Sequence, residues 1–103
     1  MHKQSGLETA IERIKQMEHY FDAVQDAMAA NPASLHENAE VARMLQALIG
    51  YYESRDWLED YERDGRGELP HDLKRGVLSE DGVYNLLYEI EQYRLCEEEN
   101  ESL

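Results

Sequence analysis

The amino-acid sequence predicts an all-α protein, a bundle of three main helices and one short extra helix with up-down topology. Three long segments have apolar residues at helical spacing, and glycine, proline and serine lie between these segments. The 103 residues are enough for one hydrophobic core but too few for two. We therefore expect a single helical domain over residues 6–97, with a flexible N-terminus at 1–5 and a frayed acidic tail at 98–103.

The first predicted helix covers residues 6–30. Its large apolar residues recur every seven positions, which gives the helix one buried face. These residues are Leu7, Ile14, Phe21 and Met28. Ser5 and Glu8 form a capping box at its start, and Pro32 ends it because proline cannot continue the helical hydrogen-bond ladder. The heptad spacing also fits a coiled coil, but packing within the chain is the simpler interpretation.

The second predicted helix covers residues 35–64 and begins at another capping box, formed by Ser34 and Glu37. The short linker makes it antiparallel to the first helix. Its apolar face consists of Leu35, Ala42, Leu45, Ile49 and Tyr52. The seven-residue spacing then reaches Asp56, whereas the next large apolar residue is Trp57, so the buried face rotates. We expect the helix to kink, break or change its packing partner there.

A glycine-containing loop separates this helix from the last one. Gly65 and Gly67 end the second helix, since glycine adopts left-handed caps without steric cost. Pro70 suits the first turn of a short helix at 70–75. Ser79 is then expected to cap the last main helix, at 80–97. The apolar residues of that helix are Val83, Leu86, Leu87, Ile90 and Tyr93.

The composition limits the possible partners. The formal net charge of −13 repels phosphate backbones and anionic lipids, so we expect no direct binding to nucleic acid or membranes. A protein partner should be basic or neutral. No apolar run is long enough for a membrane span or a signal peptide, so cytoplasmic residence is expected. Cys96 is the one cysteine, which excludes an internal disulfide and a multi-thiolate zinc site within one chain.

The segment DYERDGRGELPHD, at 60–72, has the pattern of the first half of an EF-hand calcium loop. Asp60, Glu62 and Asp64 occupy the first three ligand positions of such a loop. His71, however, stands where a bidentate carboxylate is required, and the apolar position is a glycine. We therefore predict no metal site. Weak divalent-cation binding by these three carboxylates is the alternative, and a solvated acidic helix end is the simpler interpretation.

The sequence contains no motif for catalysis or for a cofactor. It lacks both GxxxxGK[ST] and GxGxxG, and no cofactor is predicted. His36, Glu37 and Glu40 spell HExxE, which lacks the second histidine of the zinc-protease motif. Paired carboxylates could support acid–base chemistry, but chance pairs are common among 23 acidic residues. A small enzyme that uses paired carboxylates therefore stays an alternative.

Aromatic residues are concentrated after residue 50. They are Tyr51, Tyr52, Trp57, Tyr61, Tyr84, Tyr88 and Tyr93. Tyrosine and tryptophan combine an apolar ring with a polar group, which suits protein interfaces. The same property suits the partly exposed edge of a helical bundle, so both interpretations stay open.

The run from Tyr51 to Leu87, YYESRDWLEDYERDGRGELPHDLKRGVLSEDGVYNLL, resembles a small bacterial family known as domain of unknown function 4298. The residues that carry the resemblance are Tyr51, Tyr52, Ser54, Trp57, Asp60, Leu69, Pro70, RGVLSED at 75–81 and YNLL at 84–87. The similarity extends from about Ile11 to Ile90. It implies a helical bacterial protein of the cytoplasm, and it brings no activity, cofactor or catalytic residue.

We interpret RGVLSED as a folding motif. Its glycine ends the short helix, its valine and leucine fill the core, and its serine and second acid begin the next helix. These residues are Gly76, Val77, Leu78, Ser79 and Asp81. Arg75 is expected to pair with Asp56 or Asp60.

The function predicted from these observations is non-catalytic protein interaction or regulation. The surface expected to carry it is aromatic and acidic, and it includes Trp57, Tyr61 and the 64–72 loop. The residues singled out for interaction or as motif residues are Tyr52, Ser54, Trp57, Asp60, Tyr61, Arg75, Ser79, Asp81 and Tyr84.

Overall fold

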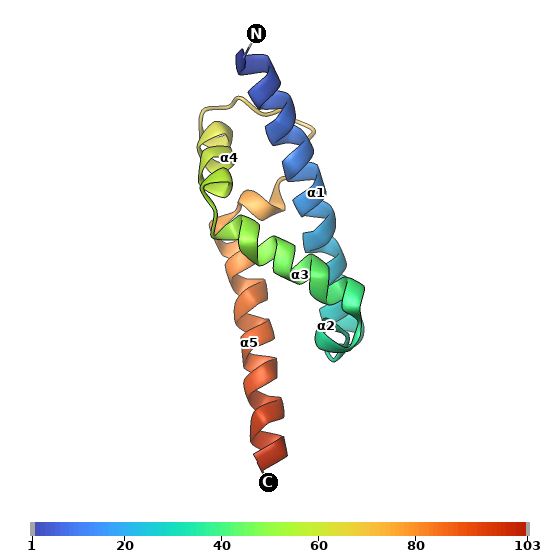
Figure 1. Ribbon diagram of the computed structural model, residues 1–103. Coiled ribbons are helices and arrows are strands. Elements are labelled where there is room, and N and C mark those ends of the chain that lie inside the picture. Colours follow the sequence, from blue (N-terminus) through green and yellow to red (C-terminus); the bar gives the residue numbers. More distant parts are fainter. Residues whose placement is uncertain (1, 103) are drawn as a thin grey trace.

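The computed structural model describes the backbone of residues 2–102 and the side chains of residues 6–79 and 81–96. Every regular element in the described part of the chain is helical, which confirms the all-α prediction. In chain order the elements are α1 (His2–Ala30), α2 (Ser34–Glu37), α3 (Ala39–Tyr52), α4 (Arg55–Gly65), the 3-10 helix η1 (Gly76–Leu78) and α5 (Glu80–Ser102) (Figure 1).

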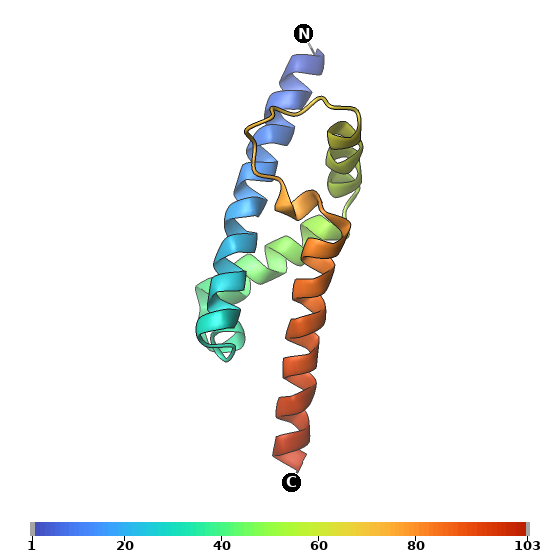
Figure 2. The same ribbon diagram turned by 180° about the vertical axis from the view of Figure 1, so that it is seen from behind.

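The helices form an elongated molecule with extents of 60 × 22 × 22 Å. Figures 1 and 2 show α3 crossing α1 obliquely, α4 beside the N-terminal half of α1, and α5 running away from the α3–α4 junction. The two ends of the chain therefore point in opposite directions. Among the described residues, no helix is both long and apolar enough to cross a membrane.

Helix α1 buries one face, as the heptad spacing predicts. Ile14 and Phe21 are buried, and Leu7 and Met28 are half-buried against the same core. The helix ends at Ala30, before Pro32, which confirms the predicted end. Its backbone is helical from His2, and α5 continues to Ser102, so helical structure extends beyond the predicted range 6–97 at both ends. The side chains of the two predicted terminal segments lie outside the described residues.

The second predicted helix is wrong as one continuous element, because 35–64 is divided into α2, α3 and α4. Ser34 does not cap it: its Oγ donates a hydrogen bond to the Asn31 carbonyl oxygen. The side chain of Asn38 caps α3 instead, where its Oδ1 accepts from the backbone N–H groups of Glu40 and Val41. The buried face of α3 is also rotated from the predicted one, because Leu48 is fully buried and the predicted Ile49 is only half-buried.

Of the three changes expected near Asp56, a kink, a break or a change of packing partner, the structure shows a break, and its cause is a cap. Helix α3 ends at Tyr52, and Ser54 adopts an extended backbone conformation. Its Oγ donates to the carbonyl oxygen of Tyr51 at 2.6 Å and accepts from the N–H of Trp57 at 3.3 Å. One side chain thus ends α3 and begins α4.

The predicted short helix at 70–75 is wrong. Residues 66–75 form turns and irregular structure, and the one helical turn nearby is η1. Leu69 and Leu73 are both buried, so the segment packs along the core and does not form a helix. Gly67 has a φ of 73°, the left-handed conformation that commonly follows a helix C-terminus, and it ends α4 as predicted.

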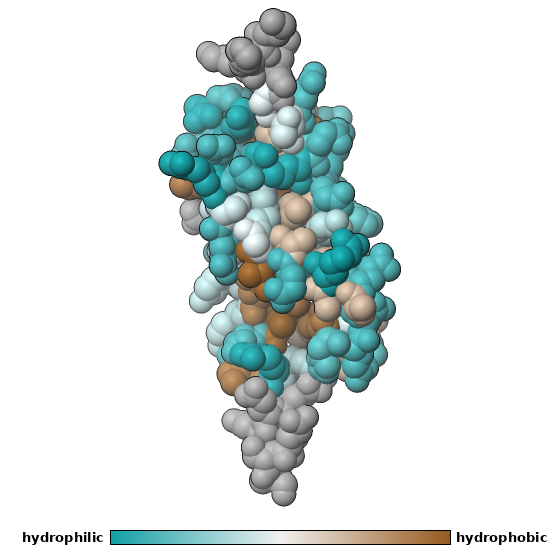
Figure 3. Space-filling model, viewed as in Figure 1, coloured by the Kyte–Doolittle hydropathy of each residue, from teal (hydrophilic) through white to brown (hydrophobic). Residues whose placement is uncertain are grey.

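One cluster of buried apolar residues joins α1, α3, η1 and the beginning of α5. Its fully buried members are Ile14, Val24, Leu48, Val77, Leu78 and Val83. Ile49, Leu87 and Ile90 are half-buried against this cluster. Figure 3 shows apolar side chains gathered in the middle of the molecule.

Two helical glycines should respond in opposite ways to alanine. Alanine favours a helix by about 0.5–1 kcal/mol over glycine. At Gly50 in α3 an added Cβ meets nothing within 4 Å, so Gly50→Ala should raise the free energy of unfolding by that amount. At Gly82 in α5 the Cβ would lie 2.9 Å from the carbonyl oxygen of Gly76, so Gly82→Ala should lower it by about 1–3 kcal/mol. Urea unfolding followed by tryptophan fluorescence measures both; equal changes would contradict the packing of α5 on η1.

Candidate functional site

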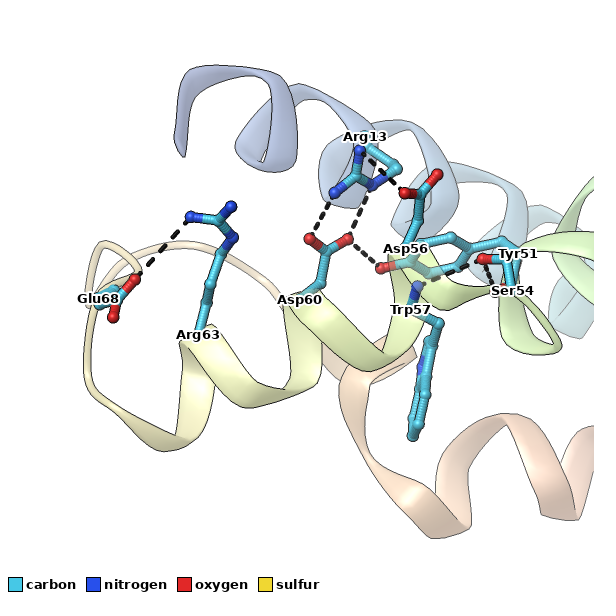
Figure 4. A network of polar contacts seen from close by, with 8 residues as sticks. All are labelled: Arg13, Tyr51, Ser54, Asp56, Trp57, Asp60, Arg63 and Glu68. Atoms are coloured by element: carbon cyan, nitrogen blue, oxygen red, sulfur yellow. Dashed lines mark hydrogen bonds and ion pairs between the residues drawn. The ribbon is translucent and has the colours of Figure 1, made fainter. Parts of the chain in front are cut away.

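Asp60 is the most deeply buried charged residue of the described chain. Its side chain is 0% exposed although it lies in α4, a short helix at the edge of the molecule. Its Oδ2 accepts from Arg13 Nε at 2.9 Å and from the Tyr51 hydroxyl at 2.7 Å, while its Oδ1 accepts from Arg13 Nη2 at 2.6 Å (Figure 4). Arg13 therefore binds both oxygens of the carboxylate, which is the strongest geometry for this pair.

The Asp60 network joins three helices at one point. Arg13 comes from α1, Tyr51 from the last turn of α3 and Asp60 from the middle of α4. A second acid of α4, Asp56, lies 3.9 Å from Arg13 Nη1 at the exposed side of the network. The network fixes α4 on α1 even though α4 buries few apolar side chains of its own.

The surroundings of Tyr51 and Arg13 raise the pKa of both side chains. Burial raises the pKa of the Tyr51 hydroxyl far above its usual value near 10, and its hydrogen bond to Asp60 raises this pKa further. The hydrogen bond to Asp60 also raises the pKa of the Arg13 guanidinium. Tyr51 consequently stays a neutral donor and Arg13 a cation throughout the physiological pH range.

The three carboxylates of the calcium-like pattern have separate protein partners. Asp60 is held by Arg13 and Tyr51, the exposed Glu62 lies 3.9 Å from Arg66, and Asp64 accepts from Arg75 at 2.8 Å. The side chains that the structure describes include no group of three or more histidine, cysteine, aspartate or glutamate residues that could hold a metal ion. The pattern in the sequence thus corresponds to a buried structural acid followed by one exposed and one partly exposed ion pair.

Glu18 is a second buried acid, and the sequence analysis did not single it out. Its Oε1 and Oε2 accept from the backbone N–H groups of Gly76 and Val77, at 3.1 and 3.0 Å. A Cβ at position 76 would lie 3.0 Å from Glu18 Oε1, so glycine gives the carboxylate room to approach. The signal in the sequence is its position, four residues after Ile14 and three before Phe21, which places an acid on the buried face of α1.

The RGVLSED motif is a structural junction in this chain. Val77 and Leu78 are buried, and Ser79 Oγ accepts from the N–H of Gly82 at the start of α5, as predicted. The predicted pairing of Arg75 with Asp56 or Asp60 is wrong, because its partner is Asp64. Asp60 is already occupied by an arginine from α1, which lies too far away in the sequence for local spacing to reveal.

The aromatic residues form two clusters. In the first, Trp57 is half-buried, its Nε1 donates to the Val77 carbonyl oxygen at 2.8 Å, and its ring stacks on Tyr61 at 5.1 Å and meets the edge of Tyr52 at 5.2 Å. In the second, Tyr84 and Tyr88 stack at 6.5 Å on α5 and are 58% and 56% exposed. The first cluster therefore attaches α4 to η1, and the second faces solvent.

A groove of about 450 Å³ lies between α1 and the irregular segment that precedes η1. Its lining includes Glu18, whose two oxygens accept the backbone hydrogen bonds of η1, and Asp22, which pairs with Lys74 at 3.1 Å. His71 is exposed and is not part of this lining. Glu18 and Asp22 thus have structural partners within the chain.

Comparison with known proteins gives one result. A family model described as a domain of unknown function (DUF4298) matches residues 14–98. No curated protein and no solved structure matches the chain.

The raised pKa of Tyr51 predicts a loss of stability in alkaline solution. Below about pH 10 the residue is protonated in both the folded and the unfolded chain. Above that pH it ionises in the unfolded chain alone, so the free energy of unfolding should fall by up to about 1.4 kcal/mol per pH unit. Urea unfolding at several pH values between about 8 and 11 measures the slope. The Tyr51→Phe variant should show a shallower slope; an unchanged slope would contradict the assignment.

Proposed function

The chain belongs to the DUF4298 family, whose description names no activity, and we propose that it is a non-catalytic protein-interaction or regulatory module with an acidic, tyrosine-rich surface. The observation that carries the proposal is the stacked pair Tyr84 and Tyr88, each more than half exposed. Large aromatic side chains are concentrated at the energetic centres of protein interfaces. In this chain two of them lie adjacent on one helix.

The state of the buried acids supports a role without catalysis. Asp60 and Glu18 are the buried acidic side chains of the described core, and a buried acid takes part in general acid–base catalysis only when it is free to exchange a proton with a substrate. The oxygens of Asp60 accept from Arg13 and Tyr51, and those of Glu18 accept from two backbone N–H groups. Both acids thus serve folding.

The charge supports a basic or neutral protein as partner. The whole chain carries a formal charge of −13, and α5 contains eight acidic residues against one basic residue. Such a surface attracts a cationic partner and repels nucleic acid and anionic lipid. Residence in the cytoplasm, where such a partner would be met, stays a prediction.

Site-specific photo-crosslinking in lysate of the native host tests the proposal. A photoreactive phenylalanine analogue replaces Tyr84 in α5, Tyr61 in α4 or, as a control, the exposed Arg43 in α3. We expect a discrete protein adduct at position 84 or 61 that an excess of unmodified chain competes away, and no such adduct at position 43. Absence of a competed adduct at both aromatic positions would contradict an interaction function.

A further inference from the structure

Helix α5 has a second apolar stripe outside the core. Tyr84, Tyr88 and Leu95 are separated by four and seven residues, so they lie within about 40° of one another around the helix axis. Leu95 is 41% exposed, and both tyrosines are exposed further. The core face of the same helix is formed by Val83 and Leu86, which are buried. One helix thus presents two apolar faces, and η1 and the rest of the core cover only one of them.

The position of α5 leaves this stripe accessible. Tyr84 and Tyr88 lie in its first half, where both are exposed on the side away from the buried Val83 and Leu86. Leu95 lies in its second half, which Figures 1 and 2 both show extending past the other helices. A helical segment without tertiary contacts is marginal in water, because most helical stability in proteins comes from packing of an apolar face. A partner that covers the stripe would provide that packing.

Charge decides which partner fits. A second copy of this chain would place one α5, with eight acidic residues and one basic residue, against another of the same composition. Two such helices repel each other. Asp81 and Glu91 are exposed and lie on the same side of the helix as the stripe. Glu91 is paired with Arg94, the one basic residue of the helix, at 2.7 Å, so the net charge around the stripe comes from the excess of acids over this one arginine along α5.

We propose that the Tyr84–Tyr88–Leu95 stripe binds a basic amphipathic helix of another protein. This inference rests on the proposed interaction function and adds the surface and the chemistry of the partner. Apolar side chains of the partner helix pack on the two tyrosines and Leu95, and its lysine or arginine residues face the acids of α5. The aromatic rings supply most of the binding energy, and the charges supply selectivity and a fast encounter.

A designed peptide tests the chemistry without knowledge of the natural partner. The probe is a helical peptide of about 20 residues with leucine along one face and lysine beside it, and its matched control has glutamate in place of every lysine. Each is titrated into the full chain, with fluorescence anisotropy for affinity and amide chemical shifts for location. We expect the lysine peptide to bind and to change the chemical shifts of α5 amides. Its affinity should fall as the salt concentration rises from about 50 to about 300 mM. The glutamate peptide should not bind.

Variants of the chain separate specific docking from general attraction between charges. The double variant Tyr84→Gln, Tyr88→Gln should bind the lysine peptide with an affinity lower by about tenfold or more. The matched control is Leu58→Gln, which removes a 49% exposed apolar side chain from α4 and should leave the affinity unchanged. Glutamine suits an exposed helix position, and circular dichroism checks that both variants keep their helix content.

Three results would overturn the proposal. The first is an affinity of the lysine peptide for the double tyrosine variant equal to its affinity for the unchanged chain. The second is a set of chemical-shift changes centred on α4 or on the groove. The third is self-association of the chain in sedimentation experiments that is lost when the two tyrosines are replaced. The crosslinking experiment separates this failure from failure of the interaction function. A competed adduct at position 61 together with no binding at α5 would keep the function and reject this surface.

Discussion

The buried carboxylate of Asp60 is the interaction on which the arrangement of α1, α3 and α4 depends. An acid with no exposed surface is unfavourable unless every oxygen has a donor, and here Arg13 and Tyr51 supply three hydrogen bonds. Because the donors come from α1 and α3, Asp60 can be satisfied only when α4 lies in one place. Helix α4 has 11 residues, too few for stability by itself, so the network provides the orientation that its own apolar surface does not.

Hydrogen bonds from two helices also hold η1, the turn directly before α5. Trp57 follows the Ser54 cap and donates to the Val77 carbonyl oxygen, while Glu18 of α1 accepts the N–H groups of Gly76 and Val77. The η1 turn is thereby held from two sides, and α5 begins directly after it. Packing reaches Leu86, Leu87 and Ile90 in the first half of this 23-residue helix, and its later part projects outward (Figure 1).

Local patterns predicted the local features, and long-range contacts decided the rest. Heptad spacing predicted the buried face of α1, and hydroxyl chemistry predicted the Ser79 cap, because both depend on residues within a few positions. Pro70 predicted a helix that does not form, since burial of Leu69 and Leu73 outweighed a weak local preference. Asp60 matched a calcium-loop pattern, but its partner Arg13 lies 47 positions away. No spacing rule connects residues so distant, and one sequence does not reveal which of 23 acids meets which arginine.

A double-mutant cycle on Arg13 and Asp60 tests the central role of this network most directly. The free energy of unfolding is measured for Arg13→Met, Asp60→Asn and the double variant, and the matched cycle uses Arg75→Met and Asp64→Asn, whose pair is partly exposed. The coupling energy should be about 2–3 kcal/mol for the buried pair and below about 1 kcal/mol for the exposed one. Equal coupling energies in the two cycles, or none between Arg13 and Asp60, would contradict this account.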